Sequence, residues 1–177
     1  MADFRQRGAS RSDILGFMRP STTLAFRVTP IPPVALDAVR RSGVDASGHP
    51  VEYLVAEGGE PLRCCLRDAR AGEAAMLFGY APPLPAASPY REVGAVFAHA
   101  GPCDGPASDG YPPDWRGRPQ VLRSYDRRGR IHWTTRVHDG GDPESVIADM
   151  LGDPEVVQVH SRNVAWGCFM FVVTRAG

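Results

Sequence analysis

Apolar and polar residues alternate over short stretches of this chain, and turn residues separate those stretches at close intervals. Alternation with a period of two is typical of strands that have one buried face. The 19 glycines and 17 prolines are spread along the whole chain, as expected for many short strands joined by turns. We predict strands at residues 22–29, 51–56, 62–67, 73–80, 93–98, 120–125, 130–137, 155–160 and 167–174.

Local signals also predict two short helices and one hairpin turn. The first helix is expected over residues 34–41, directly after Pro33. The second begins with Asp142 as N-cap and Pro143 in the first helical position, and it ends at Gly152. Between two of the strands, residues 126–129 form a turn in which Gly129 takes a positive φ.

Together these elements predict an α+β fold with two short helices. Its sheet is expected to be mainly antiparallel, with about eight strands, and to curl toward a barrel. A chain of 177 residues can bury one hydrophobic core and has little room for a second full domain. We therefore predict a single globular domain over residues 21–177, preceded by a frayed segment over residues 1–20.

The charge composition excludes several classes of protein. All twenty basic residues are arginine, so a lysine Schiff base and a P-loop lysine are both impossible. Twenty acidic residues balance them, which argues against binding to a nucleic acid backbone. Neither a membrane-spanning stretch of about 18 apolar residues nor a signal peptide core is present, so we expect a cytoplasmic protein with no membrane partner.

Four cysteines occur, at positions 64, 65, 103 and 168, and none belongs to a CxxC pair. Free thiols are expected in a reducing compartment. We predict no cofactor and no metal ligands, with zinc as a minor alternative. That alternative would combine His99, Cys103, His160 and a second cysteine, although their spacing matches no known closed pattern.

Three segments carry a family resemblance: Arg63-Cys64-Cys65-Leu66, Ser88-Pro89-Tyr90 and Gly167-Cys168-Phe169. With the segments around them, they make the chain similar to the bacterial Domain of Unknown Function 1203 family, from about Leu24 to Arg175. The resemblance implies one small domain. It implies no activity, cofactor or catalytic residue, so the chemistry has to be argued from the residues.

The first candidate for chemistry is Cys65. If residues 62–67 form a strand, Arg63 and Arg67 lie on the same face as this thiol. Two guanidinium groups would favour the thiolate and make Cys65 a nucleophile, a redox thiol or a metal ligand. The alternative is a surface strand on which a small, half-buried cysteine behaves as a hydrophobic residue.

The second candidate is a pair formed by His160 and Cys168. His160 is expected to end one strand and Cys168 to begin the next, so the two would lie near each other across a hairpin. Histidine is a known activator of a cysteine nucleophile. Alternatively, Cys168 packs in the core on a face shared with Trp166, Met170 and Val172. His160 then only caps a strand end by a hydrogen bond to the backbone.

The third candidate combines Tyr90 and Arg91 with Arg123 and Tyr125. Two arginines and two tyrosine hydroxyls could hold a carboxylate or a phosphate. The alternative is a set of cross-strand ion pairs that these arginines make with Asp68, Asp126 or Glu92.

Two classes of function remain open at this point. In the first, the protein is an enzyme that acts on a small anionic metabolite in a pocket lined by arginine, tyrosine, histidine and cysteine. Arg63, Arg91 and Arg123 would then bind the charge. In the second, it is a non-catalytic module that binds a ligand or another protein. A homodimer is left open in both.

Overall fold

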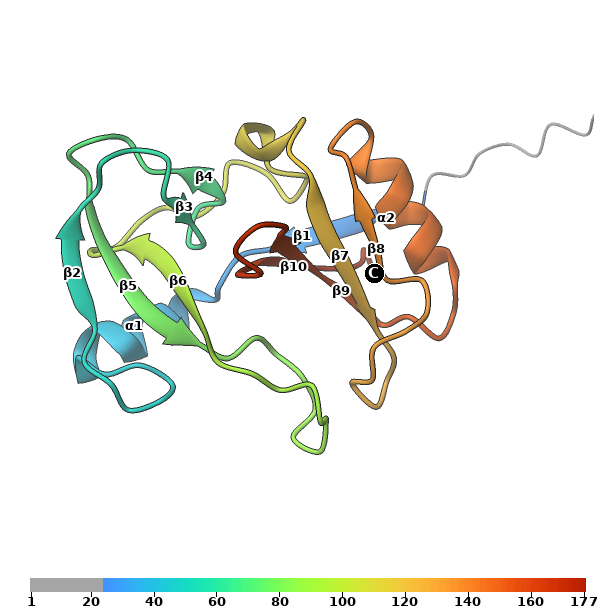
Figure 1. Ribbon diagram of the computed structural model, residues 1–177, viewed down its shortest axis with the longest axis horizontal. Coiled ribbons are helices and arrows are strands. Elements are labelled where there is room, and N and C mark those ends of the chain that lie inside the picture. Colours follow the sequence, from blue (N-terminus) through green and yellow to red (C-terminus); the bar gives the residue numbers. More distant parts are fainter. Residues whose placement is uncertain (1–23) are drawn as a thin grey trace, which may run out of the picture.

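In the part of the chain that the structure describes, ten strands form two separate sheets (Figure 1). The computed structural model describes residues 24–177, so the segment predicted over residues 1–20 lies outside the described residues. The first sheet has the order β1-β10-β9-β7-β8 and is antiparallel throughout. Its strands are β1 (Phe26–Thr29), β7 (Gln120–Tyr125), β8 (Arg136–His138), β9 (Gln158–Asn163) and β10 (Phe169–Arg175).

The second sheet has the order β2-β5-β6-β3-β4. Its strands are β2 (Glu52–Val55), β3 (Pro61–Leu62), β4 (Arg67–Asp68), β5 (Ala74–Tyr80) and β6 (Gly94–His99). All its pairs are antiparallel except that of β3 with β6, where Leu62 lies opposite Phe97.

The prediction of an α+β fold with a mainly antiparallel sheet is confirmed, but its finer description needs correction. Instead of one curled sheet of about eight strands, the described residues form two five-stranded sheets and no closed barrel. The segment 100–119 leads from β6 of one sheet to β7 of the other and is rich in proline and glycine. Proline has no N–H for a strand ladder, so this segment does not carry hydrogen bonding from one sheet into the other.

Both predicted helices are present, as α1 (Pro33–Ser42) and α2 (Pro143–Gly152). The carboxylate of Asp142 accepts a hydrogen bond from the backbone N–H of Ser145 at 3.1 Å, which confirms it as the N-cap. A single turn of 3-10 helix, η1 (Pro113–Trp115), lies in the long loop before β7. No helix within residues 24–177 has the length and apolar character that a membrane span requires.

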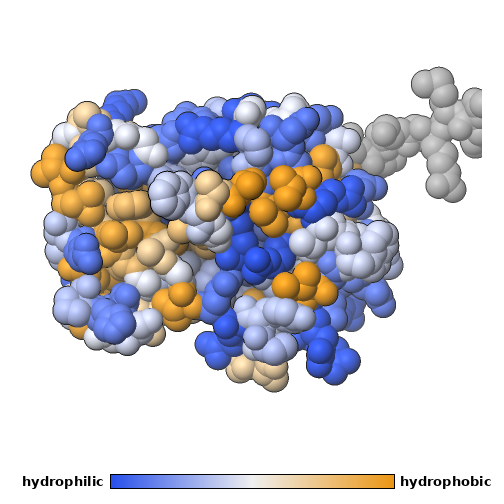
Figure 2. All heavy atoms as spheres, viewed as in Figure 1, coloured by the Kyte–Doolittle hydropathy of each residue, from blue (hydrophilic) through white to orange (hydrophobic). Residues whose placement is uncertain are grey.

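Among residues 24–177 the buried apolar side chains form two clusters. In the first, Met76, Phe78 and Val96 are buried together with Leu36 of α1. The second contains the apolar side of α2 packed on β9 and β10, and Trp115 stacks on Phe171 there with ring centres 5.9 Å apart. Figure 2 shows that apolar residues also reach the surface above the sheet formed by β2, β5 and β6.

Replacing Asp142 by alanine should lower the free energy of unfolding by about 1 kcal/mol, because the first turn of α2 loses its side-chain acceptor. Asp142→Asn is the matched control, since asparagine caps a helix about as well as aspartate. Urea unfolding of the three proteins measures the difference. No loss in Asp142→Ala would show that the cap contributes nothing, and equal losses in both variants would show that the capping oxygen is not the cause.

Candidate functional site

The segment between β3 and β4 is a tight turn rather than part of a continuous strand. Residues 63–66 form it, and the N–H of Leu66 bonds to the carbonyl of Leu62 at 2.9 Å. Leu66 has a φ of +58°, which is uncommon for any residue other than glycine. The expectation that Arg63, Cys65 and Arg67 share one strand face is therefore wrong, and the turn sends these side chains to different surroundings.

Arg63 points into the protein, where only 2% of the residue is exposed. Its Nε donates to the carbonyl of Phe169 at 2.8 Å, and its Nη1 donates to the carbonyl of Pro61. Within residues 24–177 no carboxylate forms an ion pair with this guanidinium. Burial lowers the pKa of Arg63 to about 10, so it still carries its charge at neutral pH.

A cavity of about 270 Å³ lies against Arg63. One wall comes from β5 and β6 of the second sheet, and the opposite side is the turn between β9 and β10. Trp166 stands at the rim, 81% exposed. Most of the surrounding residues are apolar; among the described residues the lining is Pro61, Arg63, Leu77, Ala95, Phe97, Asn163, Trp166 and Cys168.

Cys168 lies on this cavity and not beside His160. β9 continues for three residues past His160, and the register places Val172, not Cys168, opposite His160. The Cys168 thiol instead donates to the carbonyl of Trp166 at 3.6 Å. The expected Cys–His pair is therefore not formed. The alternative of a shared core face fails for Trp166, which is exposed, and Cys168 is only half-buried, whereas Met170 and Val172 are buried as expected.

His160 belongs to a second group of predicted residues. It is fully buried in the middle of β9, opposite Arg123 of β7, and its ring centre lies 4.7 Å from that of Tyr125. Neither ring nitrogen of His160 nor the Tyr125 hydroxyl has a hydrogen-bond partner within the described part of the chain. Burial, with the charge of Arg123 as a second cause, lowers the pKa of His160 to about 4. The imidazole is therefore neutral at pH 7.

Two residues of the third candidate lie neither on the cavity nor beside His160. Tyr90 and Arg91 are exposed, and the next residue, Glu92, lies 3.7 Å from Arg123 and also pairs with Arg162. The ion pair between Arg123 and Glu92 is one of those named as the alternative. The arginines of the sequence hypothesis thus do not converge, and only Arg63 lies on the cavity.

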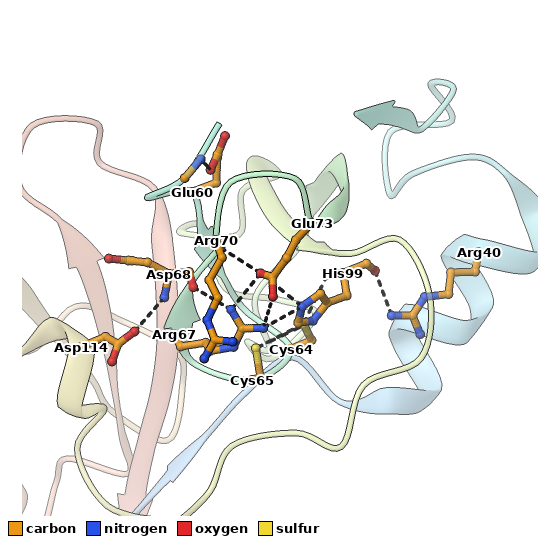
Figure 3. A network of polar contacts seen from close by, with 11 residues as sticks. Arg40, Glu60, Cys64, Cys65, Arg67, Asp68, Arg70, Glu73, His99 and Asp114 are labelled. Carbon is orange, nitrogen blue, oxygen red and sulfur yellow. Dashed lines mark hydrogen bonds and ion pairs between the residues drawn. The ribbon is translucent and has the colours of Figure 1, made fainter. Parts of the chain in front are cut away.

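A third group of polar side chains surrounds His99, and the sequence analysis anticipated it only in part (Figure 3). Cys64 and Cys65 point toward His99 at the end of β6, and the distance from Cys64 Sγ to His99 Nδ1 is 3.2 Å. Arg67 forms two hydrogen bonds with Glu73, at 2.8 and 2.9 Å, and lowers the pKa of that carboxyl to about 2. A hydrogen bond from Cys64 lowers the pKa of Cys65.

Sequence reasoning named His99 and Cys103 only in combination with His160, which lies elsewhere. The available signals were the adjacent cysteines and the H-x3-C spacing from His99 to Cys103. They were insufficient because the two segments are about 35 positions apart and only the pairing of β3 with β6 brings them together.

The geometry defines a protein of two mainly antiparallel sheets with a small apolar cavity beside a buried arginine. The model of the family described as "Protein of unknown function (DUF1203)" matches residues 59–175, and the chain belongs to this family. The matched region includes every residue that lines the cavity. The comparisons with curated proteins and with solved structures gave no significant match.

Proposed function

We propose that this protein binds a small anionic molecule with an apolar body in the cavity beside Arg63. The observation that carries the proposal is a guanidinium that is 2% exposed, borders a cavity, and has no carboxylate partner within residues 24–177. A buried charge is costly unless an opposite charge or hydrogen bonds compensate it. A ligand carboxylate would provide the missing negative charge.

The hydrogen bonds that Arg63 already makes indicate where such a ligand would bind. Nε and Nη1 are taken by backbone carbonyls, and Nη2 has no acceptor among the described residues. Asn163 accepts from the N–H of Trp166 through Oδ1, so its NH₂ group is a second available donor. Two donors at one end and apolar walls elsewhere suit a short carboxylate with a hydrocarbon chain or ring.

The lining of the cavity supports binding rather than turnover. Catalysis would need a general acid or base within hydrogen-bond reach of the ligand. Within residues 24–177 no histidine or carboxylate lines the cavity, and the Cys168 thiol donates to a backbone carbonyl. Of the two functions that the sequence left open, the proposal is therefore the ligand-binding module for a small anion.

Fluorescence of Trp166 provides the test, because this residue stands at the rim of the cavity. The protein is prepared as a Trp133→Phe variant, which removes the other exposed tryptophan, while Trp115 stays buried. Hexanoate and benzoate should give saturable signals. Hexanamide and benzamide should bind roughly tenfold more weakly or not at all, which corresponds to about 1.4 kcal/mol. Equal binding of acids and amides would exclude a role for the Arg63 charge.

Two further variants locate the binding to the cavity. Arg63→Met removes the charge, and Ala95→Phe fills the cavity from an exposed position on β6 without altering Arg63. Both should abolish the hexanoate signal. The control Arg27→Met, which changes an exposed arginine paired with Asp109, should bind normally. If Arg63→Met does not fold, Ala95→Phe provides the test. Unchanged hexanoate binding in Ala95→Phe would overturn the proposal.

A further inference from the structure

Four side chains that bind soft metal ions converge outside the cavity described above. Cys64 and Cys65 come from the turn between β3 and β4, His99 from the end of β6, and Cys103 from the loop that follows β6. Their donor atoms all lie within 4.8 Å of one another. All four cysteines of the chain are free thiols. Cys168 alone lies outside this group, which we call the thiol cluster.

We propose that the thiol cluster is a zinc site with three cysteine ligands and one histidine ligand. Three sulfurs and one imidazole are a donor set found in tetrahedral structural zinc sites. No oxygen donor belongs to the set, which disfavours magnesium and calcium. The inference does not depend on ligand binding beside Arg63, because none of the four residues lines that cavity.

The distances within the thiol cluster agree with tetrahedral coordination. With Zn–S bonds of about 2.3 Å and a Zn–N bond of about 2.0 Å, sulfurs lie about 3.8 Å apart and about 3.5 Å from the nitrogen. Cys64 Sγ and Cys65 Sγ are 3.9 Å apart, and they lie 3.2 and 3.8 Å from His99 Nδ1. Cys103 Sγ lies within 4.8 Å of each of these three atoms, and it would move toward them where that distance exceeds the tetrahedral spacing.

The surrounding charges also suit a zinc centre. Three thiolates and one Zn²⁺ carry a net charge of −1, and Arg40 and Arg67 both approach His99. Arg40 donates to the carbonyls of His99 and Ala100 at 3.1 and 3.2 Å, which holds the segment leading to Cys103 against α1. These guanidinium groups would offset the negative charge of the metal centre.

Coordination through Nδ1 requires the histidine hydrogen on Nε2. At present Arg67 Nη2 lies 3.1 Å from Nε2, while Glu73 Oε2 lies 3.9 Å from it. On metal binding Arg67 would turn fully toward Glu73, with which it already shares two hydrogen bonds. Glu73 would then accept from Nε2, as carboxylates commonly do for a ligating histidine.

A second cavity would give zinc access to the thiol cluster, and zinc bound there would join two segments of the chain. Cys65 borders a second cavity of about 340 Å³, whose other wall is the loop segment from Gly105 to Asp114. Binding would release the thiol protons and join this loop to the turn between β3 and β4. The zinc ion would thus fix the start of a long loop that has little regular structure.

Cobalt titration of the reduced, metal-free full chain tests the proposal. The expected result is a thiolate-to-cobalt charge-transfer band with tetrahedral visible bands, which saturates at a single equivalent and disappears when zinc is added. Cys65→Ala and Cys103→Ser should weaken binding by roughly 100-fold or more, since even outer-shell losses cost 10–100-fold. Cys168→Ser is the matched control and should titrate like the wild type.

Alkylation gives a measurement that does not rely on any variant folding. Zinc should protect Cys64, Cys65 and Cys103 of the wild-type protein from iodoacetamide while Cys168 is still labelled, as read by peptide mass spectrometry. Absence of a saturating cobalt band in the wild type would overturn the proposal. Equal labelling of all four cysteines with and without zinc would overturn it as well. Hexanoate binding beside Arg63 should be the same whether or not zinc binds to the thiol cluster.

Discussion

Replacing Gly140 by alanine is expected to lower the free energy of unfolding by about 3 kcal/mol or more. Gly140 has a φ of +93°, outside the range that side chains tolerate, and a Cβ there would meet backbone atoms of Gly117 and Arg118 at 2.5 Å. Backbone cannot move aside as a flexible side chain can. The added methyl group would therefore push the end of the long loop away from the segment before α2.

The matched control for this prediction is Gly48→Ala. Gly48 also has a positive φ, +79°, but nothing lies within 4 Å of the Cβ that alanine would add. Gly48→Ala should lower the free energy of unfolding by only about 1 kcal/mol, which is the cost of the backbone conformation alone. Urea unfolding of both variants separates conformational strain from steric contact. Similar losses at the two positions would show that the contact with Gly117 and Arg118 is easily relieved.

Acid should destabilise the protein by about 3 kcal/mol through His160 alone between pH 6.5 and pH 4. The pKa of His160 is about 4 in the folded protein and 6.5 as a model value. Above pH 6.5 the imidazole is neutral in both states and contributes no pH dependence. As the pH falls below 6.5, the unfolded chain binds the proton first, so folding is disfavoured until the folded state also protonates near pH 4.

The effect of His160 can be isolated by comparing stability between pH 7.5 and pH 4 in wild type and His160→Asn. Asparagine is neutral throughout, so the variant should lose about 3 kcal/mol less than the wild type over this range. His49→Asn, at an exposed position, should behave like the wild type. An NMR titration that placed the pKa of His160 near its ordinary value in the folded protein would contradict the prediction.

Elements specified by neighbouring residues could be predicted from the sequence. Asp142 and Pro143 define the start of α2 because a cap and a fixed φ act within one turn. The turn after β7 was predicted from Gly129, which has a φ of +70°. Strand periodicity located β5, β6 and β7 closely. In each case the signal that locates the element comes from residues close in the chain.

The turn at residues 63–66 could not be predicted from neighbouring residues. Alternating polar and apolar residues indicated a continuous strand, whereas Leu66 adopts a left-handed conformation that costs energy. Contacts with distant segments maintain it, since Arg63 donates its N–H to Phe97 and accepts from Ile31 through its carbonyl. Local propensity depends only on nearby residues and not on those partners. The surroundings of Arg63 and Cys65 were therefore predicted wrongly.

By itself, the sequence determined the α+β class, both helices, and the absence of lysine, which leaves arginine as the permanently charged cation. Only the tertiary structure decided that Arg63 borders a cavity while Arg123 pairs with Glu92, and that Cys64, Cys65, His99 and Cys103 meet. The physical reason is that strand partners and side-chain clusters depend on contacts between distant segments. Such contacts form only when the whole chain packs, and spacing along the sequence does not encode them.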